Sequence, residues 1–159
     1  MTDATPEPLA YLDANVFIFF FEGNPIVSER VKRLLDALRK HPGVGVTSEL
    51  TLAEVLAETE RPRAPMLKRA YLDLIVWSNF LQLVPVSRDV LYESVDLRAA
   101  HKRTHSRKLD LPDAIHLTTA IQRKCRFFIS ADGGISPPLE MKRLSPITAD
   151  LDEVLKVLT

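Results

Sequence analysis

Short apolar runs alternate with longer segments of helical periodicity along the chain. Five apolar runs have the length of strands, the last of them suited to a sheet edge: residues 9–12, 44–47, 81–86, 126–131 and 141–145. Further segments have the apolar spacing of helices: residues 14–21, 25–41, 48–60, 64–79, 87–104, 110–124 and 149–158. Because parallel strands require long crossovers, this alternation predicts an α/β fold, with a mostly parallel central sheet of four to five strands and helices on both faces.

Aromatic residues gather in the helix predicted at 14–21. Phe17, Phe19, Phe20 and Phe21 occupy more than one face of that short helix. Such a cluster predicts that some rings are exposed and form a surface for a partner, while burial of each individual ring in the core is the alternative. Trp77 and Cys125 are expected in the core.

The length of 159 residues fits one domain at 9–159, preceded by a flexible extension at 1–8. Asp3 and Glu7 stand where an export signal would need basic residues, and the apolar run 16–21 is far shorter than the roughly 20 residues that cross a bilayer. Cys125 is the only cysteine, which excludes an internal disulfide. We therefore expect a cytoplasmic protein without a membrane segment.

Charge is balanced, with 21 basic and 21 acidic residues, so affinity for nucleic acid has to come from a local patch. The segment 98–108 is the best candidate for such a patch because it is strongly basic. Within it, Arg103, Arg107 and Lys108 are predicted to contact RNA phosphates. The alternative is a basic helix end that is only solvated.

Four acidic residues stand at equivalent ends of successive α/β units. Asp13 and Asp132 come at the ends of strands, whereas Glu54 lies in the second turn of its predicted helix and Asp113 in the first turn of another. Two carboxylates about 5 Å apart repel by roughly 3 kcal/mol at an effective dielectric constant of 20, so such a cluster needs protons or cations. Oxygen ligands favour hard divalent ions, which predicts Mg²⁺ or Mn²⁺.

Each acid also has a structural alternative. Asp13 could cap the helix that follows it, and Asp113 stands where the helix dipole favours an acid, with Asp110 in a capping role before it. Glu54 could be a solvated helix residue and Asp132 an ordinary turn aspartate. Their joint placement at one edge of the sheet favours a functional site.

The sequence resembles PIN-domain ribonucleases, in the VapC toxin branch, over about residues 9–147. The segments that carry the resemblance are YLDANVFI at 11–18, SELTLAEV at 48–55, LDLPDAIHLTTA at 109–120 and FFISAD at 127–132. The resemblance implies an endoribonuclease dependent on Mg²⁺ or Mn²⁺, with a small antitoxin or a second copy of the chain as protein partner. The metal-binding acids that it implies are Asp13, Glu54, Asp113 and Asp132. After Asp132 the chain departs from the family pattern, since Gly133 and Gly134 follow where many relatives carry another acid.

The chemistry of such a site is hydrolysis of a phosphodiester by a metal-activated water, without a protein nucleophile. Four polar side chains could orient the carboxylates or the water by hydrogen bonds: Asn15, Ser48, Thr51 and Ser130. Each of them could equally be a cap or turn residue. His116 is expected to be a packed helix residue. Two other functions stay open: a non-catalytic PIN-like module that binds RNA or protein, and a haloacid-dehalogenase-type phosphatase, whose DxD pattern has Asn15 at its second position here.

Overall fold

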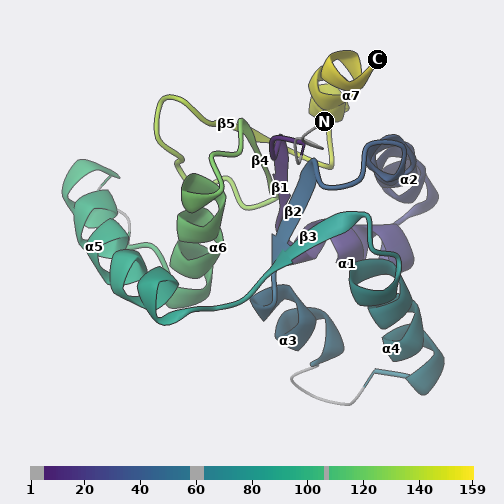
Figure 1. Cartoon of the computed structure of the whole chain (residues 1–159), viewed down its shortest axis with the longest axis horizontal. Coiled ribbons are helices and arrows are strands. Elements are labelled where there is room, and N and C mark those ends of the chain that lie inside the picture. Colours follow the sequence, from purple (N-terminus) through teal and green to yellow (C-terminus); the bar gives the residue numbers. More distant parts are fainter. Residues whose placement is uncertain (1–5, 58–62, 106–107) are drawn as a thin grey trace, which may run out of the picture.

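The computed structural model describes residues 6–57, 63–105 and 108–159 (Figure 1). Their strands form one five-stranded sheet in the order β3-β2-β1-β4-β5, and every neighbouring pair is parallel. The strands are β1 (Ala10–Leu12), β2 (Gly45–Ser48), β3 (Leu81–Val84), β4 (Phe127–Ile129) and β5 (Lys142–Leu144). The predicted α/β fold is therefore confirmed.

Helices connect the strands as the crossovers of a parallel sheet. The α-helices are α1 (Ala14–Glu22), α2 (Pro25–Arg39), α3 (Leu50–Leu56), α4 (Pro65–Leu72), α5 (Arg88–His105), α6 (Leu111–Gln122) and α7 (Asp152–Leu158). A π-helical turn, η1 (Asp73–Trp77), continues α4, and a 3-10 turn, η2 (Ala149–Leu151), precedes α7. No helix within the described residues is long and apolar enough to span a bilayer.

The sheet separates two apolar cores, because alternate side chains of a strand point to opposite faces. Ala10 and Leu12 of β1 pack with α1, α2, α4 and α7, whereas Tyr11 packs on the other face with the buried residues of α6. Figure 1 shows α5 and α6 on one side of the sheet and α1, α2 and α4 on the other. Both faces of β1 are thus covered, as the predicted architecture requires.

The strand order reverses between β1 and β4, and this reversal determines where a site can form. The crossovers from β1 run to one side along the sheet, to β2 and β3, while β4 and β5 lie on the other side. In parallel sheets of this kind, ligands bind outside the carboxyl ends of the strands at such a point. Asp13 directly follows β1, and its N–H donates to the Ile129 carbonyl at the end of β4, at 3.0 Å.

The structure corrects the predicted helix at 48–60. Ser48 lies inside β2, and α3 begins at Leu50, although the Ser48 hydroxyl does accept the Leu50 N–H at 3.1 Å. The helix ends at Leu56, and residues 58–60 lie outside the described part of the chain. The hydroxyl therefore satisfies one N–H of the helix from within the strand, which the sequence pattern does not distinguish from an N-cap.

Trp77 is not a core residue, because 69% of its surface is exposed. It belongs to the π-helical turn η1, whose longer repeat changes the face on which the last residues of the α4 segment lie. Cys125 is buried as predicted. In the aromatic cluster, Phe17 is fully buried, whereas the other three rings are partly buried against the core.

A fluorescence measurement can check the position of Trp77, which is the only tryptophan of the chain. Since 69% of the residue is exposed, acrylamide should quench its emission in the native protein nearly as efficiently as in the unfolded chain. A ring that is strongly protected only in the native protein would contradict the exposed position. Repeating the titration over a range of protein concentrations separates burial within the chain from burial between copies.

Candidate active site

Asp13 links strand β1 to helix α1 and is almost completely buried. It occupies the N-cap position in an extended conformation, and its Oδ1 accepts the Ala14 N–H at 2.7 Å. Its Oδ2 accepts the Ser130 hydroxyl at 2.7 Å and the Asn15 amide at 3.2 Å. Hydrogen bonds from these donors offset the burial of the carboxylate. Asp13 therefore caps helix α1 and also belongs to a polar site.

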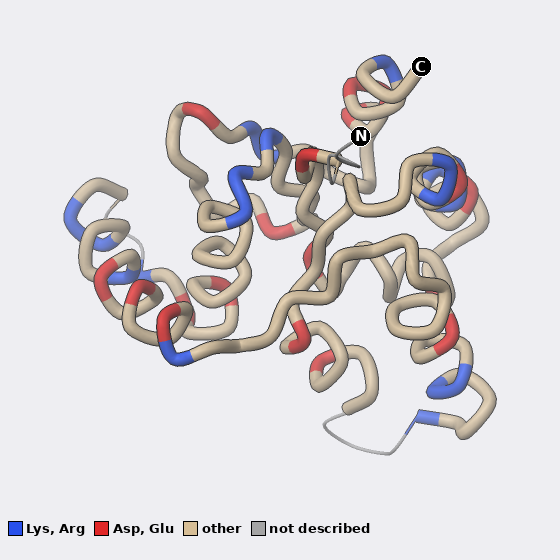
Figure 2. Tube along the Cα trace, in the orientation of Figure 1, with Lys and Arg blue, Asp and Glu red and all other residues tan. Residues whose placement is uncertain are grey.

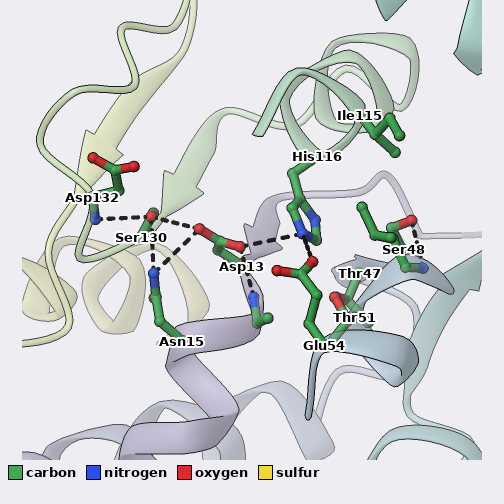
Figure 3. Close-up of polar contacts among 12 residues, drawn as sticks. Asp13, Asn15, Thr47, Ser48, Thr51, Glu54, Ile115, His116, Ser130 and Asp132 are labelled. Atoms are coloured by element: carbon green, nitrogen blue, oxygen red, sulfur yellow. Dashed lines mark hydrogen bonds and ion pairs between the residues drawn. The ribbon is translucent and has the colours of Figure 1, made fainter. Parts of the chain in front are cut away.

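Asn15 and Ser130 connect the end of β1 to the end of β4. The Asn15 amide also lies 3.2 Å from the Ser130 hydroxyl oxygen, and the Asn15 carbonyl accepts the Ala131 N–H at 3.2 Å. Ser130 in turn accepts the N–H of Asp132 at 3.1 Å (Figure 3). Asp132 accepts the Gly134 N–H at 2.8 Å, which orients its carboxylate in a tight turn.

Glu54 reaches the same region from α3 and meets His116 of α6 (Figure 3). His116 is fully buried; its Nε2 hydrogen-bonds to Glu54 and lies 3.4 Å from Asp13 Oδ1. Burial by itself would lower the pKa of His116, but the hydrogen bond to Glu54 and the charges of Asp13, Glu54 and Asp113 raise it above its ordinary value. A buried imidazole therefore lies between two of the acids.

Asp113 completes the cluster from the first turn of α6. Burial, the charges of Asp13 and Asp132, and a hydrogen bond with the Asp132 side chain raise the pKa of Asp113 to about 6. A carboxyl whose pKa is raised by two other carboxylates lies close to both of them. The structure thus brings together the four acids that the sequence singled out, from four different elements.

Two of the other predicted polar residues lie beside the acids but contact different groups. The Thr51 hydroxyl is 2.8 Å from the Thr47 hydroxyl, and Thr47 donates to the Leu12 carbonyl at 2.8 Å. Ser48 binds the N–H of Leu50. Both predicted residues therefore stabilise the junction of β2 and α3, and α3 is the helix that carries Glu54.

Two of the three predicted RNA-contact residues lie in the described part of the chain. Arg103 is exposed in the last turn of α5, and Lys108 is exposed in the segment that leads to α6. Arg107 lies outside the described residues. Figure 2 shows Lys and Arg positions gathered at the far end of α5.

The donor set suits a hard cation. Carboxylate oxygens from four elements meet with hydroxyl and amide groups behind them, and the raised pKa of Asp113 indicates negative charge that its neighbours do not neutralise. Within the described residues, no three His, Cys, Asp or Glu side chains form a ready-made cage for an ion. The acids would therefore have to shift to enclose one.

The PIN domain family model matches residues 10–136. The chain belongs to the PIN domain family. A similar fold occurs in VapBC2 from Rickettsia felis bound to a promoter DNA fragment, with a TM-score of 0.66 and 14% identity over 86% of this chain and 98% of that one. A toxin-antitoxin complex from Klebsiella pneumoniae has a TM-score of 0.60 and 23% identity over 86% of this chain and 97% of that one. The VapC20 toxin of Mycobacterium tuberculosis, which cleaves the sarcin-ricin loop, has a TM-score of 0.62 and 18% identity over 78% of this chain and 90% of that one. No curated protein sequence matches significantly.

Sequence reasoning missed three residues around the acids of this PIN domain. His116 was expected only to pack, and it does so while contacting two acids; its spacing of three residues from Asp113, on the same helix face, was the available signal. Tyr11 contacts the far side of the His116 ring. Arg143 of β5 donates to the Ser130 carbonyl at 3.0 Å, and no sequence pattern indicated it.

The raised pKa of Asp113 predicts how stability depends on pH in the PIN domain without divalent ions. The folded-state pKa of about 6 exceeds the ordinary 3.8, so the associated stability is fully present below about pH 3.8 and is lost as the pH rises through about 6. Asp113→Asn mimics the protonated group and should raise the melting temperature at about pH 7.5, with little effect near pH 4. Because the carboxyl is only half-buried, screening reduces the gain to on the order of 1 kcal/mol, or about 2–4 °C.

Asp110→Asn is the matched control for this measurement. Asp110 is exposed at the N-cap position of the same helix, and its side chain makes no capping hydrogen bond. Thermal melts of both variants and the parent, recorded in EDTA across this pH range, isolate the effect of the cluster. A gain that is equal for both variants, or independent of pH, would contradict the assigned pKa.

Proposed function

We propose that this PIN domain is an endoribonuclease that depends on Mg²⁺ or Mn²⁺ and acts as the toxin of a toxin-antitoxin pair. One observation carries the proposal: Asp13, Glu54, Asp113 and Asp132 gather at the carboxyl ends of parallel strands, where the strand order reverses. Membership of the PIN family supports nuclease chemistry over the phosphatase alternative. The toxin role is supported by structural similarity to toxins of known complexes.

The proposed reaction is hydrolysis of an RNA phosphodiester bond at the acidic cluster. A bound divalent cation would supply an activated water and a counter-charge for the phosphate. Asp13, Glu54, Asp113 and Asp132 would be its ligands. Asn15 and Ser130 hold the Asp13 and Asp132 segments in register through hydrogen bonds of 2.7–3.2 Å. In the absence of the ion, Asp113 binds a proton below about pH 6, so protonation competes with cation binding.

The proposed protein partner is a small antitoxin, with a second copy of the chain as a further candidate. VapBC2 and the Klebsiella pneumoniae protein were both solved as assemblies of this type. On the surface of this chain, Phe20, Phe21, Leu74 and Trp77 line a cavity of about 600 Å³. The exposed Trp77 and the partly buried phenylalanines give this cavity an apolar part, and Arg39, Asp73 and Ser78 line the rest, a mixture that suits a protein-binding surface.

RNA cleavage tests the proposed activity directly. Purified protein incubated with labelled RNA pools should cleave them in Mg²⁺ or Mn²⁺ and not in EDTA. Asp113→Asn should reduce the rate by at least ~100-fold, because it removes one ligand of the ion while leaving the apolar cores intact. Asp110→Asn, on the same helix, should cleave at the parent rate. Cleavage that persists in EDTA would refute metal dependence, and equal rates for both variants would remove Asp113 from the site.

The basic segment predicts a salt-dependent contact with RNA. Replacing Arg103 and Lys108 with Ala should weaken binding and flatten its salt dependence by up to about one unit of slope per lost phosphate contact. The measurement is RNA affinity across a salt series in Ca²⁺, a hard ion expected to occupy the site with little cleavage. A variant with Lys40→Ala and Lys156→Ala removes the same charge from exposed positions on other elements. Identical curves for the two variants would assign RNA entry to another surface.

A further inference from the structure

His116 contacts two of the four acids from inside the protein. Its ring is fully buried between the sheet and α6, and the Nε2 atom hydrogen-bonds to Glu54 Oε1 while lying 3.4 Å from Asp13 Oδ1 (Figure 3). Glu54 belongs to α3, whereas Asp13 follows β1. One N–H placed between carboxylates from two elements constrains their relative position.

Tyr11 holds the opposite nitrogen of the ring. Its fully buried hydroxyl lies 2.5 Å from His116 Nδ1. Burial raises the pKa of Tyr11 well above its ordinary value, so the phenol keeps a proton that it can donate to Nδ1. In a neutral imidazole, an Nδ1 that accepts leaves the ring proton on Nε2, facing the acids.

We propose that Tyr11 and His116 are a pair of positioning residues for the acidic site: Tyr11 selects the Nε2–H tautomer, and His116 uses that N–H to hold Glu54 beside Asp13. The pair rests on the proposed function, because the purpose of holding these carboxylates is to present their outward oxygens to a divalent ion. Hydrogen bonds behind ligands typically change metal affinity by about 10–100-fold.

The tautomer decides which ring nitrogen presents an N–H to the acids. A neutral ring has two tautomers, of which the Nδ1–H form would turn a lone pair toward Glu54. The Tyr11 hydroxyl excludes that form because it needs Nδ1 as an acceptor.

Mn²⁺ affinity, measured by titration calorimetry without RNA, is the first readout. Tyr11→Phe and His116→Leu should each weaken binding by about 10-fold or more. His116→Gln keeps an N–H donor near the Nε2 position and should recover most of the affinity. Circular dichroism melts of all variants establish that the protein binding the ion is folded.

Tyr71→Phe provides the matched control for the lost hydroxyl. Tyr71 is also fully buried, and its hydroxyl bonds to Glu22 on α1, away from the acidic cluster. Both variants remove a hydrogen-bonded phenol oxygen from the interior, so a merely structural role predicts equal effects. Only Tyr11→Phe is expected to change Mn²⁺ affinity.

Long-range ¹H–¹⁵N spectra of the Mg²⁺-loaded protein give the second readout. The chain has four histidines, and the His116 signals are those that His116→Gln removes. The parent should show the Nε2–H tautomer, and Tyr11→Phe a mixture of both tautomers. Parent-like affinity and tautomer in Tyr11→Phe would overturn the positioning proposal while leaving the nuclease proposal intact. A parent that binds neither Mn²⁺ nor Mg²⁺ would overturn the metal-dependent function, and the positioning role with it.

Discussion

The parallel pairing of β1 with β4 is the contact on which the site depends. Tyr11 pairs with Phe128 and Leu12 with Ile129, so the two strands end side by side. The residues that follow them then meet, and Asp13 and Ser130 hydrogen-bond although they are 117 positions apart in the sequence. The stacking of Tyr11 on Phe128, with ring centroids 5.2 Å apart, reinforces this pairing from the α6 face.

The fold stabilises each of the gathered charges by a different physical means. Asp13 is buried, and hydrogen bonds from a backbone N–H, a hydroxyl and an amide offset its loss of hydration. Glu54 is partly exposed and lies against an imidazole. Asp113 shares a hydrogen bond with the Asp132 side chain, and its burial and the charges of Asp13 and Asp132 make it bind a proton more readily. The charge of this one carboxyl is therefore not fully compensated within the cluster, and the remaining negative charge favours a cation there.

The sequence carried the architecture and the four acids because both follow from local patterns. Short apolar runs separated by helical segments predict parallel strands joined by helical crossovers. In such a sheet the carboxyl ends of all strands lie at one edge, so Asp13 and Asp132, which follow strands, lie at that edge. Tyr11 and His116 could not be paired in the same way, since they are 105 positions apart and periodicity assigns each only to a buried face. Trp77 was misplaced as well: the helix predicted at 64–79 gave no sign of the π-helical turn that carries this residue.

The position of β4 in the chain also affects when the site can form. Three of the four acids precede residue 127, whereas Ser130 and Asp132 directly follow β4, the fourth of the five strands in the described residues. Chains are made from the amino terminus and fold as their contacts become available, and contacts between distant positions form at a high entropic cost. A growing polypeptide that stops short of β4 therefore lacks Asp132 and the Ser130 hydroxyl, and the acidic cluster is complete only once β4 has paired with β1.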